Sequence, residues 1–270
     1  MLKLLRANLR RLRKSRLLWL CMAAAFAISS VFLLRIGGSE GGWTLDEALL
    51  QTLPFLPILY AVFVGLFLGT DYQDGTMRCK IIAGHTRCAV YLSQLLTAII
   101  GCLGILLAWA LSAAVGAVRL GGFTAPWTSL ALQSAVILMI LAATAAILTL
   151  FSMLITNRAV SGVVVILAVF ALLVVGSCLY NALCEPELIS SAVATESGYE
   201  IGEALPNPNY VRGALRTLYQ LLTDALPSGQ AIELANQELE HPLRSICASL
   251  GLALLTSGAG IAVFRRKDLK

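Results

Sequence analysis

Residues 71–90 form the segment of this sequence in which side chains suited to binding or chemistry are most concentrated. It reads Asp-Tyr-Gln-Asp-Gly-Thr-Met-Arg-Cys-Lys-Ile-Ile-Ala-Gly-His-Thr-Arg-Cys-Ala-Val. The pattern predicts an acidic turn punctuated by glycine, then a short basic amphipathic helix, then a second break at Gly84-His85. A short helix of this kind, lying parallel to a membrane, can present its polar face to a partner and move with it. The competing interpretation is that these charges only cap and solvate a loop.

The motifs that would indicate an enzyme are absent from the sequence. It contains no Gly-x-x-x-x-Gly-Lys-Ser/Thr loop, no His-Glu-x-x-His and no Gly-x-Ser-x-Gly. Cys79 and Cys88 have only His85 near them, which is poor spacing for zinc ligands. We therefore expect no catalytic residue, no metal site and no cofactor bound by this chain, and an intramembrane enzyme is disfavoured.

Six long apolar stretches make up most of the remaining sequence and must position the hydrophilic segment. Each holds about 20 residues or more, enough helix to cross a hydrocarbon core of ~30 Å at ~1.5 Å per residue. The mean hydropathy of +0.82 and the 13% of charged residues agree with a membrane protein. The expected spans are residues 17–36, 48–70, 91–118, 129–155, 159–180 and 245–264. The predicted fold class is an all-α polytopic membrane protein with six transmembrane helices.

Lys and Arg are distributed unevenly between the segments that connect these spans. The N-terminus, the 71–90 loop, Asn157–Arg158 and the C-terminal tail hold 15 of the 20 Lys/Arg and 3 of the 15 Asp/Glu. The other connections hold the remaining 5 basic and 12 acidic residues. Because basic residues accumulate on the cytoplasmic side, we expect both termini to be cytoplasmic in a multi-pass protein.

The first 16 residues are predicted to form an amphipathic elbow helix that lies along the membrane surface. Leu2, Leu5, Leu9 and Leu12 recur at helical spacing and would share one face. The residues expected to face the membrane surface and its anionic lipid are Lys3, Arg6, Arg10, Arg13 and Lys14. A simple basic anchor with incidental leucines is the alternative. Nucleic-acid binding is not expected, because this basic stretch lacks interleaved aromatic residues.

The segment 181–244 is the one sizeable hydrophilic region and would be extracellular. It is predicted to be helical, with an amphipathic helix over 210–226, a stop at Pro227-Ser-Gly229 and a short helix over 230–239. Cys178 and Cys184 both approach this side, so a disulfide between them is considered, although helix-end geometry is restrictive.

Two parts of the 71–90 loop resemble a known pattern. Asp-Tyr-Gln-Asp-Gly-Thr-Met-Arg followed by Ile-Ala-Gly-His-Thr-Arg is similar to the first cytoplasmic loop of type-2 ABC transporter permeases, the membrane-spanning subunits of ABC exporters. The layout also agrees: a basic elbow (1–16), a six-span domain (17–270), a long outer segment before the last span, and a basic C-terminus. The resemblance is specific over about 30 residues of the chain.

The resemblance implies a permease subunit that works with other chains. Two permeases, identical or sister subunits, would bind two copies of a separate cytosolic ABC ATPase, which would itself hold ATP and magnesium. The positions assigned to coupling with that ATPase are Asp71, Asp74, Gly75, Thr76, Arg78, Lys80, Gly84, His85 and Arg87. Residues of the second and fifth spans would line the substrate pathway.

The resemblance also suggests a bacterial cell membrane and a peptide, drug or other amphipathic cargo, as in export of, or immunity to, bacteriocin- or lantibiotic-like peptides. A different class of function stays open beside it. A membrane scaffold or sensor subunit of a signalling complex would share the basic elbow and the outer segment, but would need no ATPase.

Overall fold

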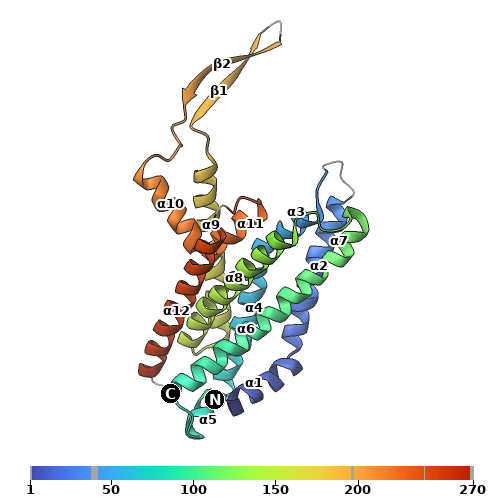
Figure 1. Ribbon diagram of the computed structural model, residues 1–270. Coiled ribbons are helices and arrows are strands. Elements are labelled where there is room, and N and C mark those ends of the chain that lie inside the picture. Colours follow the sequence, from blue (N-terminus) through green and yellow to red (C-terminus); the bar gives the residue numbers. More distant parts are fainter. Residues whose placement is uncertain (1, 38–41, 196–197, 240, 268–270) are drawn as a thin grey trace.

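The computed structural model describes residues 2–37, 42–195, 198–239 and 241–267, and for residues 190–203 the backbone alone. Its long helices run side by side as one bundle, and a β-hairpin projects from one end (Figure 1). The elements in chain order are α1 (Leu2–Lys14), α2 (Arg16–Ile36), α3 (Leu45–Leu50), η1 (Leu53–Phe55), α4 (Leu56–Gln73), α5 (Thr76–Ile82), α6 (Arg87–Leu111), α7 (Ala113–Leu120), α8 (Trp127–Leu154), α9 (Arg158–Cys184), β1 (Leu188–Thr195), β2 (Gly198–Pro206), α10 (Ala214–Ala225), α11 (Pro227–Ala235) and α12 (Pro242–Arg266).

The six predicted spans are confirmed. Within the described residues, six helical segments are long and apolar enough to cross a membrane, and they cover residues 16–36, 45–73, 87–120, 127–154, 158–184 and 242–266. The chain is thus a multi-pass membrane protein. The start of α1 and the end of α12 lie at the same end of the bundle (Figure 1), as an even number of spans requires. We call this the basic end, and the opposite one the hairpin end.

The helices differ in how much of their surface the bundle covers. We compare the 18 most apolar consecutive residues of each span. Of these, 67% are buried in the span that contains α4 and 72% in α8, but only 22% in α9 and 11% in α12. Small residues let the central helices approach closely, because a side chain on Gly65 of α4 would begin only 3.1 Å from the Cα of Gly162 in α9. The exposed apolar faces of α9 and α12 are suited to lipid or to another membrane protein.

Two spans are broken near the hairpin end, where buried polar side chains hydrogen-bond to one another. Pro54 and Pro57 interrupt the second span, which therefore consists of α3, the 3₁₀ turn η1 and α4. Thr52 lies at this break, where its hydroxyl accepts a hydrogen bond from the Trp109 indole at 2.7 Å and lies 3.2 Å from the Ser29 hydroxyl. Ser112, at the α6–α7 junction, joins Ser29 at 2.8 Å. Polar groups buried in a membrane protein are satisfied internally in this way.

The prediction of a helical outer segment is wrong for its first part. Residues 188–206 form the antiparallel pair β1–β2, whose register joins Leu188 to Pro206 and is shifted between Ser190 and Ala192. The two predicted helices are present as α10 and α11, and α10 ends just before Pro227 as predicted, but α11 begins at Pro227 and not at Gln230. Proline is favoured there because its missing N–H falls in the first helical turn, where no partner is needed.

The two outer cysteines do not pair. Cys178 and Cys184 lie on the same helix, α9, and all seven cysteines, each within the described residues, are free. Six residues of helix separate the pair by about 9 Å along the axis at ~1.5 Å per residue, whereas a disulfide needs Cα atoms within about 7 Å. The disulfide considered from the sequence is therefore excluded by the continuity of α9.

Candidate functional site

Asp71 is a buried carboxylate in the last turn of α4, at the basic end of the bundle. Its side chain is only 1% exposed. The C-terminal end of a helix carries a partial negative charge, so a carboxylate there is unfavourable unless cations compensate it. A buried carboxylate also needs hydrogen bonds to replace those it made with water. Donors from neighbouring elements therefore have to hold Asp71 in place.

Four side chains supply these donors, two to each carboxylate oxygen. Oδ1 accepts from Arg11 Nη1 of α1 and, at 2.6 Å, from Thr76 Oγ1 of α5. Oδ2 accepts from Lys80 Nζ of α5 at 3.1 Å and from Gln94 Nε2 of α6. We call these five side chains the Asp71 network. It joins α1, α4, α5 and α6 at a single carboxylate.

Asn8 and Phe67 add further contacts around the network. The Asn8 side chain accepts from Lys80 Nζ at 3.1 Å, and its amide nitrogen donates to Ser93 Oγ of α6 at 3.4 Å. Arg11 Nη2 donates to the Phe67 carbonyl at 2.5 Å, and the guanidinium lies 4.1 Å from the centre of the Phe67 ring. Arg11 thus binds the C-terminal half of α4 through an ion pair, a carbonyl and an aromatic face.

The charges of the network and its neighbour Asp74 balance. Burial lowers the pKa of Arg11, and the nearby Asp74 carboxylate acts in the opposite direction. Burial also lowers the pKa of Lys80, to about 8, with the Arg11 guanidinium adding to the effect. The Asp71 carboxylate, 3.1 Å from the Lys80 ammonium, opposes this lowering. Lys80 is therefore charged at neutral pH, and two cations face two carboxylates.

Glycine residues set both ends of α5. Gly75 has φ +66° and immediately precedes the first residue of the helix, while Gly84 has φ +84° and lies two residues after its last. The Gly84 amide donates to the Ile81 carbonyl at 2.9 Å and the His85 amide to the Lys80 carbonyl at 3.3 Å. This pair of bonds is a Schellman motif, in which the left-handed position favours glycine. The predicted breaks on both sides of the short helix are confirmed.

The two faces of α5 have different surroundings. Thr76 and Lys80 point into the Asp71 network, and Met77 between them is 1% exposed. Arg78 and Cys79 are exposed on the other side, and Ile82 is 84% exposed. Ile82 is thus an apolar side chain exposed at the charged end of the molecule. We call Arg78, Cys79 and Ile82 the outer face of α5.

The structure divides the nine predicted coupling residues into four groups. Asp71, Thr76 and Lys80 meet in the network. Asp74 and Arg78 are exposed, and Gly75, Gly84 and His85 shape the ends of α5. Arg87 lies elsewhere: its guanidinium donates to the carbonyls of Phe264 and Arg265 at 3.3 and 3.0 Å, at the C-terminal end of α12.

The C-terminal tail makes a second set of contacts at the basic end. Lys267 Nζ donates to the carbonyls of Met153 and Leu154, at 2.9 and 3.0 Å, and lies 4.6 Å from the centre of the Tyr72 ring. Burial lowers the pKa of Lys267. Lys267 thus caps the C-terminal end of α8, as Arg87 does for α12.

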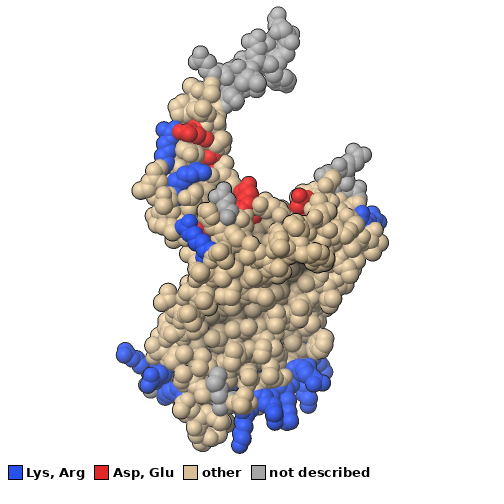
Figure 2. Space-filling model, in the orientation of Figure 1, with Lys and Arg blue, Asp and Glu red and all other residues tan. Residues whose placement is uncertain are grey.

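A helix, α1, is present where the sequence predicts an elbow, and the face that it buries against the bundle includes one of the four leucines predicted to share a face, Leu12. Leu4, Asn8 and Leu12 are buried, whereas Leu2 is 82% exposed and Leu5 and Leu9 are only half-buried. The reason is that α1 packs against α6, where Asn8 meets Ser93. All five residues predicted to face the membrane surface are exposed: Lys3, Arg6, Arg10, Arg13 and Lys14. Figure 2 shows Lys and Arg gathered at this end.

Sequence reasoning missed three residues of the site: Asn8, Arg11 and Gln94. A signal for Asn8 was present, because it lies four residues from both Leu4 and Leu12 and so shares their helical face. Gln94 is a polar residue inside an apolar span, which indicates a buried partner. Nothing in its local sequence distinguishes Arg11 from the other basic residues of α1.

No family model matches the chain, and no curated protein matches it by sequence. Among the described residues, no group of three or more His, Cys, Asp and Glu side chains lies close enough together to hold a metal ion.

Proposed function

We propose that this chain is the membrane-spanning permease subunit of an ATP-driven ABC exporter, with α5 as its coupling helix. The observation that carries the proposal is the two-sided setting of α5. One side is joined to α1, α4 and α6 through Asp71, and the other exposes Arg78, Cys79 and Ile82. A force applied to the outer face by a partner would therefore reach three other helices through a buried, charge-assisted network.

The resemblance of residues 71–87 to type-2 ABC permeases supports the identity of that partner. It would be a cytosolic ATPase with a phosphate-binding loop, present in two copies, and ATP and magnesium would bind to it. The basic end would then be cytoplasmic, in agreement with the positive-inside rule. The exposed cations of α1 would contact anionic headgroups in the cell membrane, at ~1 kcal/mol for each Lys or Arg near the surface.

A second permease subunit, identical or a sister chain, would complete the pathway. Most of the second span is buried within this chain, so α9 is better placed than α4 to face a second subunit. The exposed side chains of α9 include Val163, Leu167, Phe170 and Val174. An apolar surface of this kind suits an amphipathic cargo such as a peptide or drug.

Co-purification with the ATPase tests the proposal. We expect Ile82→Glu, which introduces a charge on the outer face of α5, to abolish recovery of a P-loop ATPase with the tagged chain from its native host. Leu2→Glu is the matched control, because Leu2 is equally exposed at the same end but lies on α1. If the wild type recovers no P-loop ATPase, the exporter proposal is contradicted and the scaffold function is favoured. If Ile82→Glu recovers as much ATPase as the wild type, the assignment of α5 as the coupling helix is contradicted.

A further inference from the structure

Four leucines of α10 lie on the molecular surface at the hairpin end of the bundle. They are 40–50% exposed: Leu215, Leu218, Leu221 and Leu222. Their spacings of three and four residues place them on a single stripe of the helix. A contiguous apolar surface of this kind indicates contact with something other than water. We call these four residues the leucine face of α10.

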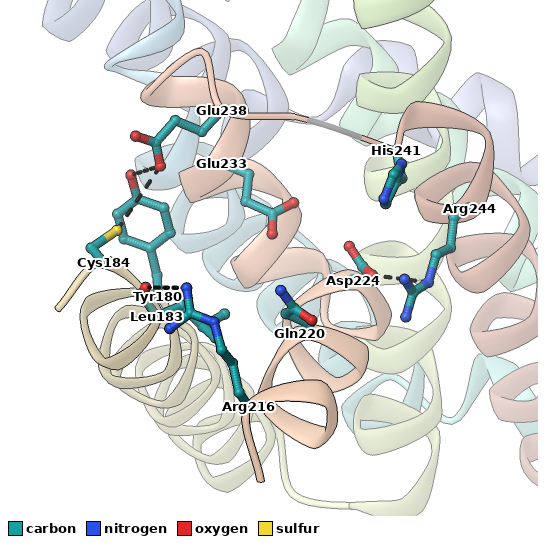
Figure 3. Close-up of a pocket in the computed structure, with 10 residues that line it drawn as sticks. All are labelled: Tyr180, Leu183, Cys184, Arg216, Gln220, Asp224, Glu233, Glu238, His241 and Arg244. Atoms are coloured by element: carbon teal, nitrogen blue, oxygen red, sulfur yellow. Dashed lines mark hydrogen bonds and ion pairs between the residues drawn. The ribbon is translucent and has the colours of Figure 1, made fainter. Parts of the chain in front are cut away.

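The opposite side of α10 is polar and faces the protein. Arg216, Gln220 and Asp224 line a polar cavity of about 490 Å³ that lies between α10, the end of α9 and the start of α12 (Figure 3). Arg216 Nη2 donates to the Leu183 carbonyl at 3.1 Å, and Asp224 is paired with Arg244 at 3.0 Å. A helix on a protein surrounded by water buries its apolar side and exposes its polar side. The reverse arrangement in α10 indicates apolar surroundings.

Contacts with α9 give the depth at which α10 ends. The Ser228 hydroxyl, three residues after the end of α10, donates to the Leu172 carbonyl at 2.7 Å. A side chain on Gly176 would begin 2.7 Å from the same hydroxyl oxygen. At ~1.5 Å per residue, Leu172 and Gly176 lie about 21 and 27 Å along α9 from its first residue, Arg158. Because a hydrocarbon core is ~30 Å thick, the C-terminal end of α10 reaches the outer edge of that core.

The N-terminal end of α10 lies farther out. Arg216 contacts Leu183, which by the same measure is about 37 Å from the start of α9. Headgroups add ~5–8 Å to the core on each side, so this end of α10 lies among them. The helix also packs against α12, a span in which only 11% of the most apolar residues are buried. The leucine face therefore adjoins a surface that must be covered within the membrane.

We propose that the leucine face of α10 is inserted into the lipid leaflet at the hairpin end, in contact with acyl chains. The helix then lies at the boundary between acyl chains and headgroups, with its polar side toward the cavity. This is the position of an interfacial amphipathic helix. The segment between α9 and α12 is thus held to the bilayer as well as to the bundle. The contact needs no ATPase, so it stands or falls independently of the exporter proposal.

Photo-cross-linking of the full-length chain in membranes of its native host tests the proposal. The photoreactive residue p-benzoylphenylalanine, which inserts into nearby C–H bonds, would replace Leu218. We expect ultraviolet light to add the mass of one phospholipid to the chain, as measured by mass spectrometry. The same replacement of Gln220 is the matched control, because Gln220 is also exposed on α10 but lines the cavity. It should lose the lipid adduct. Leu254 of α12, which is 66% exposed, is the positive control.

Each outcome decides the question. A phospholipid adduct at position 218 and none at position 220 supports the proposal. A protein adduct in place of lipid at position 218 would show that α10 docks on a partner chain, and the proposal would be overturned. No adduct there, while position 254 gives one, would show a leucine face in water and would also overturn it. So would equal lipid adducts at positions 218 and 220.

Hydroxyl-radical footprinting of the unmodified chain in lipid nanodiscs gives a second readout that no substitution can disturb. Radicals formed in water oxidise leucine side chains that water reaches. The leucine face of α10 should be oxidised no faster than Leu254 of α12, although both are exposed in the isolated chain. Faster oxidation of the leucine face would place it in water and overturn the proposal.

Discussion

Replacing Asp71 by asparagine should release α5 from the bundle. The carboxylate receives two donors on each oxygen: Arg11 and Thr76 on Oδ1, Lys80 and Gln94 on Oδ2. In either orientation of an asparagine, the NH₂ group would face two donors instead of accepting from them. The substitution would also leave two cations without their buried counter-charge.

The size of the effect follows from the burial of the network. Removing one partner of a buried ion pair costs ~3–5 kcal/mol. The Arg11 side chain is still 34% exposed, so solvent screens part of its charge and the lower value of about 3 kcal/mol applies. At ~1.4 kcal/mol for each factor of ten, the population with α5 detached should rise by about a hundredfold or more.

Amide hydrogen exchange, measured by mass spectrometry on the protein in lipid nanodiscs, checks this prediction. Exchange within Thr76–Ile82 should accelerate by about a hundredfold in Asp71→Asn, because exchange follows the open population. Asp74→Asn is the matched control: it lies three residues away, is exposed, and should change exchange little. Equal exchange of α5 in both variants and the wild type would refute the role assigned to the Asp71 network.

Three further predictions concern other parts of the bundle. Gly65→Ala should lower the melting temperature, because the new Cβ would lie 3.1 Å from the Gly162 Cα and overpacking costs ~1–3 kcal/mol. Gly258→Ala, which has open space around it, should leave the melting temperature unchanged. Gln230→Leu should increase proteolysis of the α10–α11 region by trypsin. The buried Gln230 amide donates to the backbone carbonyls of Asp224 and Ser245 and accepts from the Ser249 hydroxyl, so its loss would loosen the contact between α11 and its neighbours. Lys267→Gln should speed hydrogen exchange in the last turn of α8, whose carbonyls Lys267 caps; unchanged exchange would show that the cap contributes nothing.

The bundle could be predicted from the sequence because its cause is local. Each span is long, apolar and nearly free of charge, and six such segments leave little choice of architecture. The bounds of α5 were likewise readable, since Gly75 and Gly84 supply the positive φ angles that its two ends require. These features depend on neighbours along the chain.

The Asp71 network could be predicted only in part, because it depends on contacts between distant segments. Arg11 and Asp71 lie 60 residues apart, and six other basic residues precede or adjoin the first span. Because α1 packs on α6, Arg11 is the basic residue that reaches Asp71. The same packing buries Leu4 and Leu12 and leaves Leu2 exposed. The hairpin was missed because its short strands show only a weak alternation of apolar and polar residues, which is the pattern that indicates a strand.

The outer face of α5 offers the most direct test of the central proposal, that this helix docks on an ABC ATPase. Cys79 is an exposed free thiol on that face. A short thiol-to-amine cross-linker applied to membranes of the native host should join the chain to a P-loop ATPase through Cys79, and Cys79→Ser should abolish the product. A P-loop ATPase cross-linked only through other positions, or no such product from the wild type, would contradict the assignment of α5 as the coupling helix.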